Sequence, residues 1–216
     1  MPRRALRKTD TSLDLSWHLK QWDDLPQPWD PAAIFGRQAP VEVEVGSGKG
    51  MFLLSAAGHR PDTNFLGIEL AEKYAEYCAA RLAKRKIGNA CVVHADAGRV
   101  FAELLPEASV SAVHVYFPDP WWKARHKKRR VMNERFARHI ERTLQPGGSL
   151  HFWSDVEEYF QTTLATLAAM THLSGPLPVA QRAAEHDLDY RTNFERRVRR
   201  AGRPIYRAEF RKRSAT

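Results

Sequence analysis

Short apolar runs alternate with longer amphipathic segments from residue 41 onward. The apolar runs predict five strands, at 41–45, 64–70, 90–96, 111–117 and 149–155. Apolar positions three and four residues apart predict helices at 51–59, at 71–86 with Gly88 closing it, and at 134–144. Strands that alternate with helices in this way indicate an α/β fold with a doubly wound, mostly parallel sheet. Ligands of such sheets bind beyond the carboxyl ends of the strands.

Residues 1–40 lack this periodicity, and Trp17, Trp22 and Trp29 stand there among prolines and charged residues. They are predicted to form an irregular arm. Residues 41–216 are expected to form a single domain that ends in a basic segment. A chain of 216 residues with 43% hydrophobic content is long enough to bury a substantial core.

The formal net charge of the chain is +9. Clustered lysine and arginine displace the counterions condensed on phosphate backbones, so this charge favours a nucleic acid as partner. Cys78 and Cys91 are too few for a disulfide framework and lack zinc-ligand spacing, as do the scattered histidines, so no metal is expected. No apolar run approaches the length that spans a bilayer, and we expect a soluble protein of the cytoplasm without a membrane partner.

The segment EVGSGKG follows the first predicted strand. Its alternating glycines, Gly46, Gly48 and Gly50, let the backbone turn sharply and approach a ligand with no Cβ in the way. A phosphate-binding P-loop is excluded because Lys49 precedes a glycine instead of serine or threonine. A standard dinucleotide fingerprint is excluded because Met51 occupies its third glycine position. The loop is therefore typical of nucleotide binding without specifying a phosphate.

Acidic residues follow three successive strands. Glu69 ends the second strand, where an acid can accept hydrogen bonds from both ribose hydroxyls, and Asp96 follows the third. Because nothing nearby offers a grip for a pyrophosphate, the pattern favours a nucleoside without phosphates, of which S-adenosylmethionine is one. Glu44, just before the glycine turn, is placed to face the cationic methionine portion. The alternative for Glu44 and Glu42 is an edge or half-exposed strand with alternating charge.

The fourth strand runs into FPDPWWKARHKKRR. Pro118 and Pro120 restrict the backbone on either side of Asp119, which holds this carboxylate in place with little entropy to lose. Trp121 and Trp122 offer faces on which an extruded base can stack. The ordinary alternatives are prolines that only end a strand and tryptophans that belong to the core.

Two basic runs, distant in sequence, are predicted to flank one cleft and to hold phosphates. No acid interrupts the first run, which favours phosphate binding over a solvated loop. Its members are Lys123, Arg125, Lys127, Lys128, Arg129 and Arg130. The members of the second run are Arg196, Arg197, Arg199, Arg200 and Arg203.

Five segments together, FPDPWWKARHKKRR, EVGSGKG, FLGIEL, HADA and TNFERR, resemble the bacterial tRNA (guanine-N7)-methyltransferase family from about Val41 to Arg197. The resemblance implies a Rossmann-like class I methyltransferase fold whose last strand is antiparallel, with S-adenosylmethionine as methyl donor. It implies tRNA as partner and N7 of a variable-loop guanine as acceptor. Trp122 departs from the family, where proline or histidine is frequent, and so does Asn193, where lysine is common.

The resemblance also implies roles for individual residues. Asp119 would lie between cofactor and base as the catalytic residue. The implied cofactor contacts are Glu44, Gly46, Gly48, Glu69, Asp96 and Asp119. The implied substrate contacts are Lys123, Asp155, Thr192, Asn193, Phe194 and Glu195, although Asp155 has an alternative as a helix N-cap. The implied tRNA contacts are Arg125, His126, Lys127, Lys128, Arg129 and Arg130.

The chemistry of guanine N7 suits this set of residues. Its lone pair carries no proton, so attack on a sulfonium methyl needs positioning and electrostatics but no general base. A carboxylate at Asp119 would attract the positive charge that develops on the purine. It would also accept hydrogen bonds from guanine N1 and N2, an edge that adenine does not present. The alternatives are another S-adenosylmethionine-dependent methyltransferase and a catalytically silent RNA-binding relative; a nucleotide-dependent dehydrogenase is disfavoured by the missing glycine.

Overall fold

A computed structural model describes residues 6, 9–179 and 190–214. The strands are β1 (Leu19–Gln21), β2 (Val41–Val45), β3 (Asn64–Glu69), β4 (Ala90–His94), β5 (Val110–Tyr116), β6 (Leu144–Ser154), β7 (Ser174–Leu177) and β8 (Tyr206–Arg211). The helices are α1 (Pro31–Phe35), α2 (Met51–His59), α3 (Glu72–Lys84), α4 (Ala97–Arg99), α5 (Glu134–Thr143), α6 (Glu157–Met170) and α7 (Asn193–Arg200). Three short turns complete the set: 3-10 turns η1 (Trp22–Asp24) and η3 (Ala124–Arg129), and a π-helical turn η2 (Val100–Leu104).

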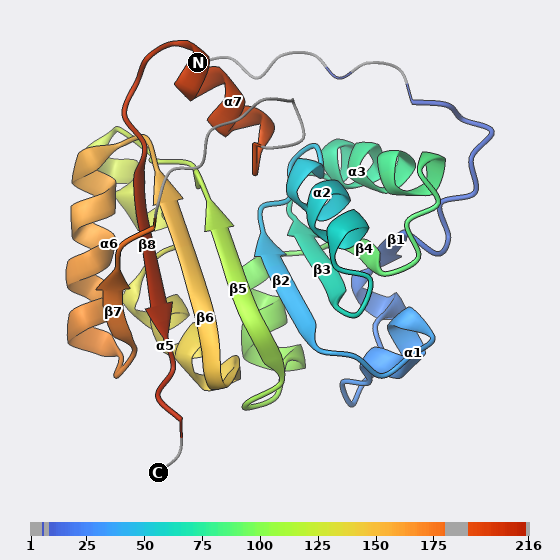
Figure 1. Ribbon diagram of the computed structural model, residues 1–216, viewed down its shortest axis with the longest axis horizontal. Coiled ribbons are helices and arrows are strands. Elements are labelled where there is room, and N and C mark those ends of the chain that lie inside the picture. The colour runs from blue at the N-terminus through green and yellow to red at the C-terminus, as the bar shows by residue number, and fades with distance from the viewer. Residues whose placement is uncertain (1–5, 7–8, 180–189, 215–216) are drawn as a thin grey trace.

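The described strands form one sheet in the order β1-β4-β3-β2-β5-β6-β8-β7 (Figure 1). Neighbours from β1 to β6 are parallel, while β8 runs antiparallel to both β6 and β7. The predicted doubly wound, mostly parallel sheet is confirmed, and so is the antiparallel last strand, which is β8. From β2 the chain moves outward in one direction to β3 and β4, and later returns to β5 on the other side. The carboxyl ends of β2 and β5 therefore border the switch point where ligands of such sheets bind.

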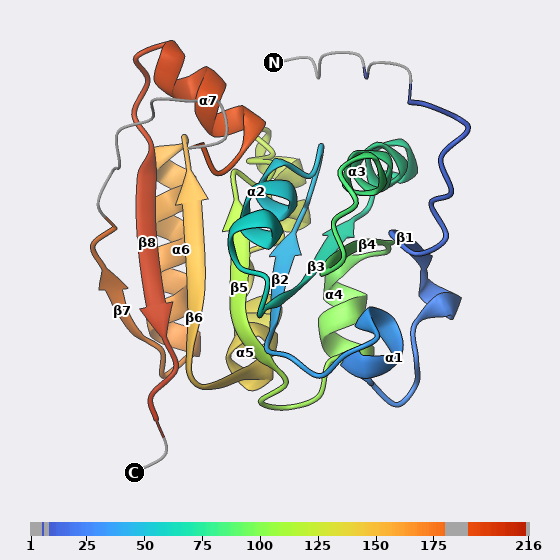
Figure 2. The same ribbon diagram turned by 45° about the vertical axis from the view of Figure 1, so that its right-hand side comes forward.

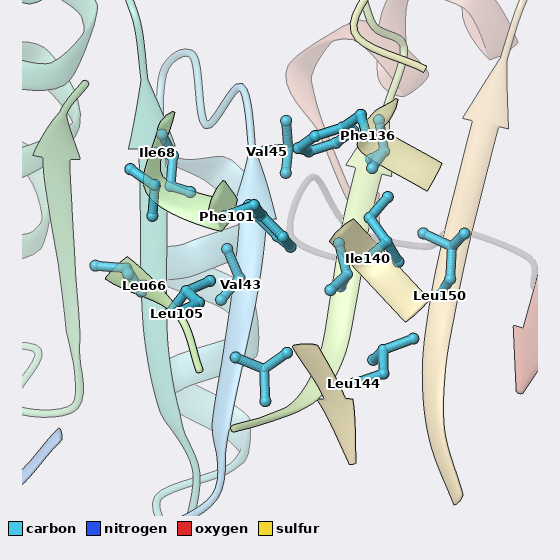
Figure 3. Packing of buried hydrophobic residues seen from close by; sticks show 14 of the residues in the cluster. Val43, Val45, Leu66, Ile68, Phe101, Leu105, Phe136, Ile140, Leu144 and Leu150 are labelled. Carbon is cyan, nitrogen blue, oxygen red and sulfur yellow. The ribbon is translucent and has the colours of Figure 1, made fainter. Parts of the chain in front are cut away.

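Helices cover both faces of the sheet. On one face, α5, α6 and the segment after α4 pack on apolar side chains of the central strands, as Figure 3 shows for Phe101 and Phe136 near Val43 and Val45. On the other face, α2 and α3 pack on the opposite side of β3 and β4. The alternation along β2 sends its valines to the first face and its glutamates to the second. Helix α7 lies above the carboxyl ends of β5 and β6 (Figures 1 and 2).

The N-terminal arm contributes more order than its sequence predicts. Strand β1 pairs in parallel with β4, with Leu19 opposite Val92, and extends the sheet at its edge. Helix α1 begins after Asp30, whose carboxylate accepts a hydrogen bond from the amide of Ala32 at 2.9 Å. A strand of three residues, none of them buried, is too short to leave a periodic signal in the sequence.

The third helix ends earlier than predicted. Helix α3 stops at Lys84, and Lys86 takes the left-handed conformation with φ of 53°. The amide of Ile87 then donates to the carbonyl of Leu82 at 3.2 Å, which closes the helix end. The prediction that Gly88 closes this helix was wrong, because a non-glycine residue makes the turn.

None of the helices among the described residues is long and apolar enough to cross a membrane. The same residues contain no cluster of three histidine, cysteine or acidic side chains with the geometry to hold a metal ion.

Candidate active site

The glycine turn after β2 is held against β3. The amide of Gly46 donates to the carbonyl of Ile68 at 2.8 Å, and Gly46, Gly48 and Gly50 have φ of 79°, 53° and 66°. Gly50 is the residue directly before helix α2. A Cβ on Gly50 would lie 2.3 Å from the Sγ atom of Cys78 on α3. Gly50 is thus required both by its backbone conformation and by the close approach of α3.

Glu69 ends β3 beside this turn. Its two carboxylate oxygens accept hydrogen bonds from the amides of Gly48, at 2.8 Å, and Ala71, at 2.9 Å. These two bonds fix the carboxylate while leaving lone pairs for further donors. Asp96 follows the neighbouring strand β4, is exposed, and accepts a hydrogen bond from the amide of Arg99 at 3.0 Å as the N-cap of α4. Both acids lie at one edge of the sheet.

Glu44 is a buried carboxylate that lacks full compensation. Its side chain is 2% exposed, and its Oε2 atom has no hydrogen-bond partner. Burial, and secondarily the charge of Glu69, raise the pKa of Glu44 well above its ordinary value. A cationic group placed against Oε2 would satisfy this oxygen and favour the ionised form. The edge-strand alternative is wrong, because β2 lies between β3 and β5 and all five of its residues are buried.

S-adenosylmethionine fits these residues. The orphaned oxygen of Glu44 suits the ammonium group of its methionine portion, and the fixed carboxylate of Glu69 suits ribose hydroxyls. At Gly46 no atom lies within 4 Å of the place a Cβ would take, so the backbone there is open to a close approach.

The loop that carries Asp119 is strained on both sides. Phe117 and Trp121 have φ of 51° and 46°, a region that side-chain-bearing residues rarely adopt. Each such residue costs about 1–3 kcal/mol, and such costs gather at functional loops. The amide of Phe117 donates to the carbonyl of Trp153 on β6 at 2.8 Å. Asp119 is exposed at the carboxyl end of β5, next to β2 and its glycine turn.

Helix α7 brings the TNFE segment to this loop. The rings of Phe194 and Phe117 lie 5.0 Å apart between centroids. Thr192 is the N-cap of α7, and its hydroxyl accepts from the amide of Glu195 at 2.9 Å. The amide of Arg191 donates in return to the carboxylate of Glu195 at 2.7 Å. This reciprocal capping orients α7, with Asn193 as its first residue, above the strand ends.

Glu195 occupies a different place from the predicted one. It is 3% exposed, and its carboxylate lies 3.5 Å from the guanidinium of Arg199 and 3.4 Å from that of Arg207. Its carboxylate therefore holds α7 against β8 instead of presenting itself to a substrate. Asp155 forms an ion pair with Arg203 beside the same helix. The N-cap alternative for Asp155 is wrong, because Val156 is the residue before α6 and its amide donates to the Ser154 hydroxyl at 3.1 Å.

The first basic run forms turn η3 and the residues that flank it. Lys123, Arg125, Lys127, Lys128 and Arg129 are exposed, and His126 is half-buried. Arg130 differs from the prediction because its side chain is only 6% exposed and is paired with Glu158.

The two tryptophans of the loop differ in exposure. Trp122 is 70% exposed, a large apolar side chain presented to solvent beside Asp119. Trp121 is half-buried, with the Arg129 guanidinium 5.1 Å from its ring. The exposure of Trp122 counts against the alternative that it is a core residue.

Polar residues that the sequence reasoning did not assign lie behind the site, of which His114 and Glu42 are buried and Arg191 is exposed. Burial lowers the pKa of His114 and keeps its ring neutral, so Nε2–H donates to Glu42 at 2.8 Å and Nδ1 accepts from the Tyr116 hydroxyl at 2.9 Å. The Arg60 guanidinium also donates to Glu42, at 2.5 Å. The guanidinium of Arg191 lies about equally far from the Phe52 and Trp153 rings, at 6.0 and 5.9 Å. Arg191 directly precedes the TNFE segment, and this position is the sequence signal from which its place near the site could have been predicted.

Comparison with known proteins identifies the family. Residues 38–208 match a family described as "Putative methyltransferase". A tRNA (guanine-N(7)-)-methyltransferase of Rhodopirellula baltica is 48% identical over 220 residues, which cover 99% of this chain and 81% of that protein. The chain belongs to the tRNA (guanine-N7)-methyltransferase family. The predicted family is thus confirmed.

Other comparisons agree with this assignment. The family member of Cupriavidus necator is 39% identical over 192 residues, covering 88% of this chain and 73% of that protein. The structure of the 16S rRNA methyltransferase KamB matches with a TM-score of 0.61 at 17% identity, covering 85% of this chain and 94% of KamB. At that identity the match shows a shared fold.

Proposed function

We propose that this protein transfers a methyl group from S-adenosylmethionine to N7 of a guanine in the variable loop of tRNA. One observation carries the proposal: the orphaned carboxylate of Glu44 and the strained loop of Asp119 lie at the ends of the adjacent strands β2 and β5. The family relatives, whose names give this base and this RNA, support it. A tRNA substrate supports a cytoplasmic location for the reaction.

Residues at the glycine turn would hold the cofactor. Glu44 would face the ammonium group, Glu69 the ribose and Asp96 another part of the nucleoside, while Gly46 and Gly48 would allow close contact. When bound, S-adenosylmethionine supplies a methyl carbon that accepts the N7 lone pair as the carbon–sulfur bond returns its electrons to sulfur. No proton leaves N7, so the chain needs no general base.

Asp119 stabilises the charge that appears on the base. Its carboxylate is more attractive to a purine that is becoming cationic than to neutral guanine, which lowers the barrier to transfer. It also accepts from guanine N1–H and the N2 amino group, which selects guanine over adenine. The exposed ring of Trp122 offers a face on which the extruded base stacks.

The surrounding tRNA lies on the basic surface next to this loop. Lys123, Arg125, Lys128 and Arg129 present exposed cations to phosphates, and α7 carries further arginines above the same strand ends. Asp155, Thr192, Asn193 and Phe194 border the guanine from the side of α7. The two basic runs that are distant in sequence thereby serve one substrate.

The test is methyl transfer from labelled S-adenosylmethionine to unmodified tRNA transcripts, with wild type and Asp119→Asn. Mild reduction and aniline cleavage then locate any 7-methylguanosine. We expect cleavage in the variable loop with wild type and a loss of at least about 100-fold in rate with the variant, the size found on removal of one electrostatic group. Wild type that binds cofactor and tRNA but yields no 7-methylguanosine would refute the proposed reaction and favour another RNA atom or a silent relative.

A further inference from the structure

The basic run contains one cation that does not face solvent. The Arg130 side chain is 6% exposed. Its Nη1 and Nη2 atoms donate to the two carboxylate oxygens of Glu158 on α6, at 3.2 and 2.7 Å. Its Nε atom donates to the carbonyl of Pro120 at 2.8 Å. One guanidinium therefore joins helix α6 to the residue that directly follows Asp119.

Further contacts fix the orientation of this guanidinium. Its Cζ atom lies 4.4 Å from the centroid of the Tyr159 ring. The Tyr159 hydroxyl in turn accepts from the amide of Met132 at 3.2 Å, and Asn133 donates to the carbonyl of Arg130 at 3.2 Å. Hydrogen bonds from Arg130, and then from Lys127, lower the pKa of Glu158 to about 2, so its carboxylate is ionised at any physiological pH.

The Arg130 contact is made to the backbone of Pro120. Proline has no amide hydrogen, so its carbonyl is the only hydrogen-bonding group its backbone offers. The residue after it, Trp121, has the strained φ of 46°, which persists only if surrounding contacts hold the loop. Asp119 lies near Tyr159, the residue whose ring contacts the Arg130 guanidinium. Burial, and after it the charge of Asp119, raise the pKa of Tyr159 to about 12.

We propose that Arg130, held by Glu158, is a positioning residue that fixes the Asp119 loop in its reactive place, and that it is not a contact to tRNA phosphate. This inference rests on the proposed role of Asp119. A guanidinium suits the task because its planar fork reaches the carboxylate and the carbonyl at once, which an ammonium group does not do in the same geometry. The Glu158 carboxylate is half exposed, and an ion pair with an exposed partner contributes little stability of its own, so we assign the value of this pair to geometry.

The principal test compares Arg130→Lys with wild type. Lysine keeps the charge opposite Glu158 and the number of trypsin sites, but loses the fork. We expect kcat to fall at least about 10-fold, since small misplacements of a reacting group have effects of this size, with KM for tRNA changed less than about 2-fold. Limited trypsin digestion followed by mass spectrometry should show faster cleavage within residues 123–129, a readout that needs no activity.

Two further variants complete the experiment. Glu158→Gln should reproduce both effects, and the double variant should be no worse than the worse single one, because the two side chains act as a unit. Arg211→Lys is the matched control, because it makes the same exchange at an exposed arginine. Arg211 is the last residue of β8, and its guanidinium pairs with Glu209 at 2.9 Å. This control variant should leave kcat and cleavage unchanged.

Specific results would overturn the inference. Wild-type kcat with a raised KM for tRNA would make Arg130 an RNA contact. Unchanged trypsin cleavage would show that the loop does not depend on Arg130, and unfolding of both variants below the assay temperature would assign the pair to domain stability. Wild type that makes no 7-methylguanosine refutes the proposed function instead, and the digestion still tests whether Arg130 holds the loop.

Discussion

Replacing Gly50 by alanine tests the close packing behind the cofactor site. The new Cβ would lie 2.3 Å from Cys78 Sγ and 3.2 Å from Cys78 Cβ, while the backbone there has φ of 66°. The left-handed conformation costs an alanine about 1–2 kcal/mol more than a glycine. The overlap with Cys78 adds about 1–3 kcal/mol, the usual effect of an extra carbon in a full core.

Together these terms predict that Gly50→Ala lowers the free energy of unfolding by about 2–5 kcal/mol. For a chain of this length, that corresponds to a fall in Tm of about 4–20 °C. Affinity for S-adenosylhomocysteine should fall as well, because Gly50 joins the glycine turn to α2. Gly58 in the same helix is the matched control. A Cβ there meets nothing within 4 Å, so Gly58→Ala should stabilise by about 0.5–1 kcal/mol.

The assay is urea unfolding of Gly50→Ala, Cys78→Ala and the double variant, with calorimetric titration of S-adenosylhomocysteine. Removing the sulfur relieves the overlap but not the backbone strain. The double variant should therefore be about 1–2 kcal/mol more stable than the sum of the single effects predicts. Effects that add within about 0.5 kcal/mol would refute the reasoning, because the sulfur would then not be what the new methyl meets.

Two further predictions concern the glutamates of β2. Burial raises the pKa of Glu44, so its ionisation opposes folding, and wild type should lose stability relative to Glu44→Gln as pH rises above 4.5. The variant should nevertheless bind S-adenosylhomocysteine more weakly than wild type. Equal binding would contradict the proposed role of Glu44 in holding the cofactor. Burial on its own would raise the pKa of Glu42, but hydrogen bonds and charge from His114 and Arg60 outweigh this effect and lower the pKa from 4.5 to about 2. Glu42→Gln should therefore cost roughly 3 kcal/mol at pH 7, and the difference should shrink as pH falls from 4.5 toward 2, as urea unfolding across pH would show.

The central elements could be predicted from the chain because their signals are local. Predicted strand 41–45 and helix 51–59 coincide with β2 and α2, and 134–144 differs from α5 by one residue. Alternation of apolar runs with amphipathic helices implies a parallel sheet, which in turn places Glu44, Glu69 and Asp119 at one edge. The prolines on both sides of Asp119 predict a loop of restricted conformation at this residue.

Which side chains are buried, and which charged groups pair, could be decided only from the folded structure. The sequence VEVEV fits an edge strand as well as a central one, and only the neighbours β3 and β5 decide that Glu44 is buried. Strands β1 and β7 have three and four residues and take their conformation from their partners.

The basic run shows the same division most clearly. Its charge, and the long-range attraction to phosphates that the charge implies, follow from composition, because the net charge of a segment is the sum of its residue types. Which cation turns inward depends on Glu158, 28 residues away along the chain, and on the carbonyl of Pro120. Such contacts form only when α6 packs on the sheet, so no local pattern distinguishes Arg130 from Arg129.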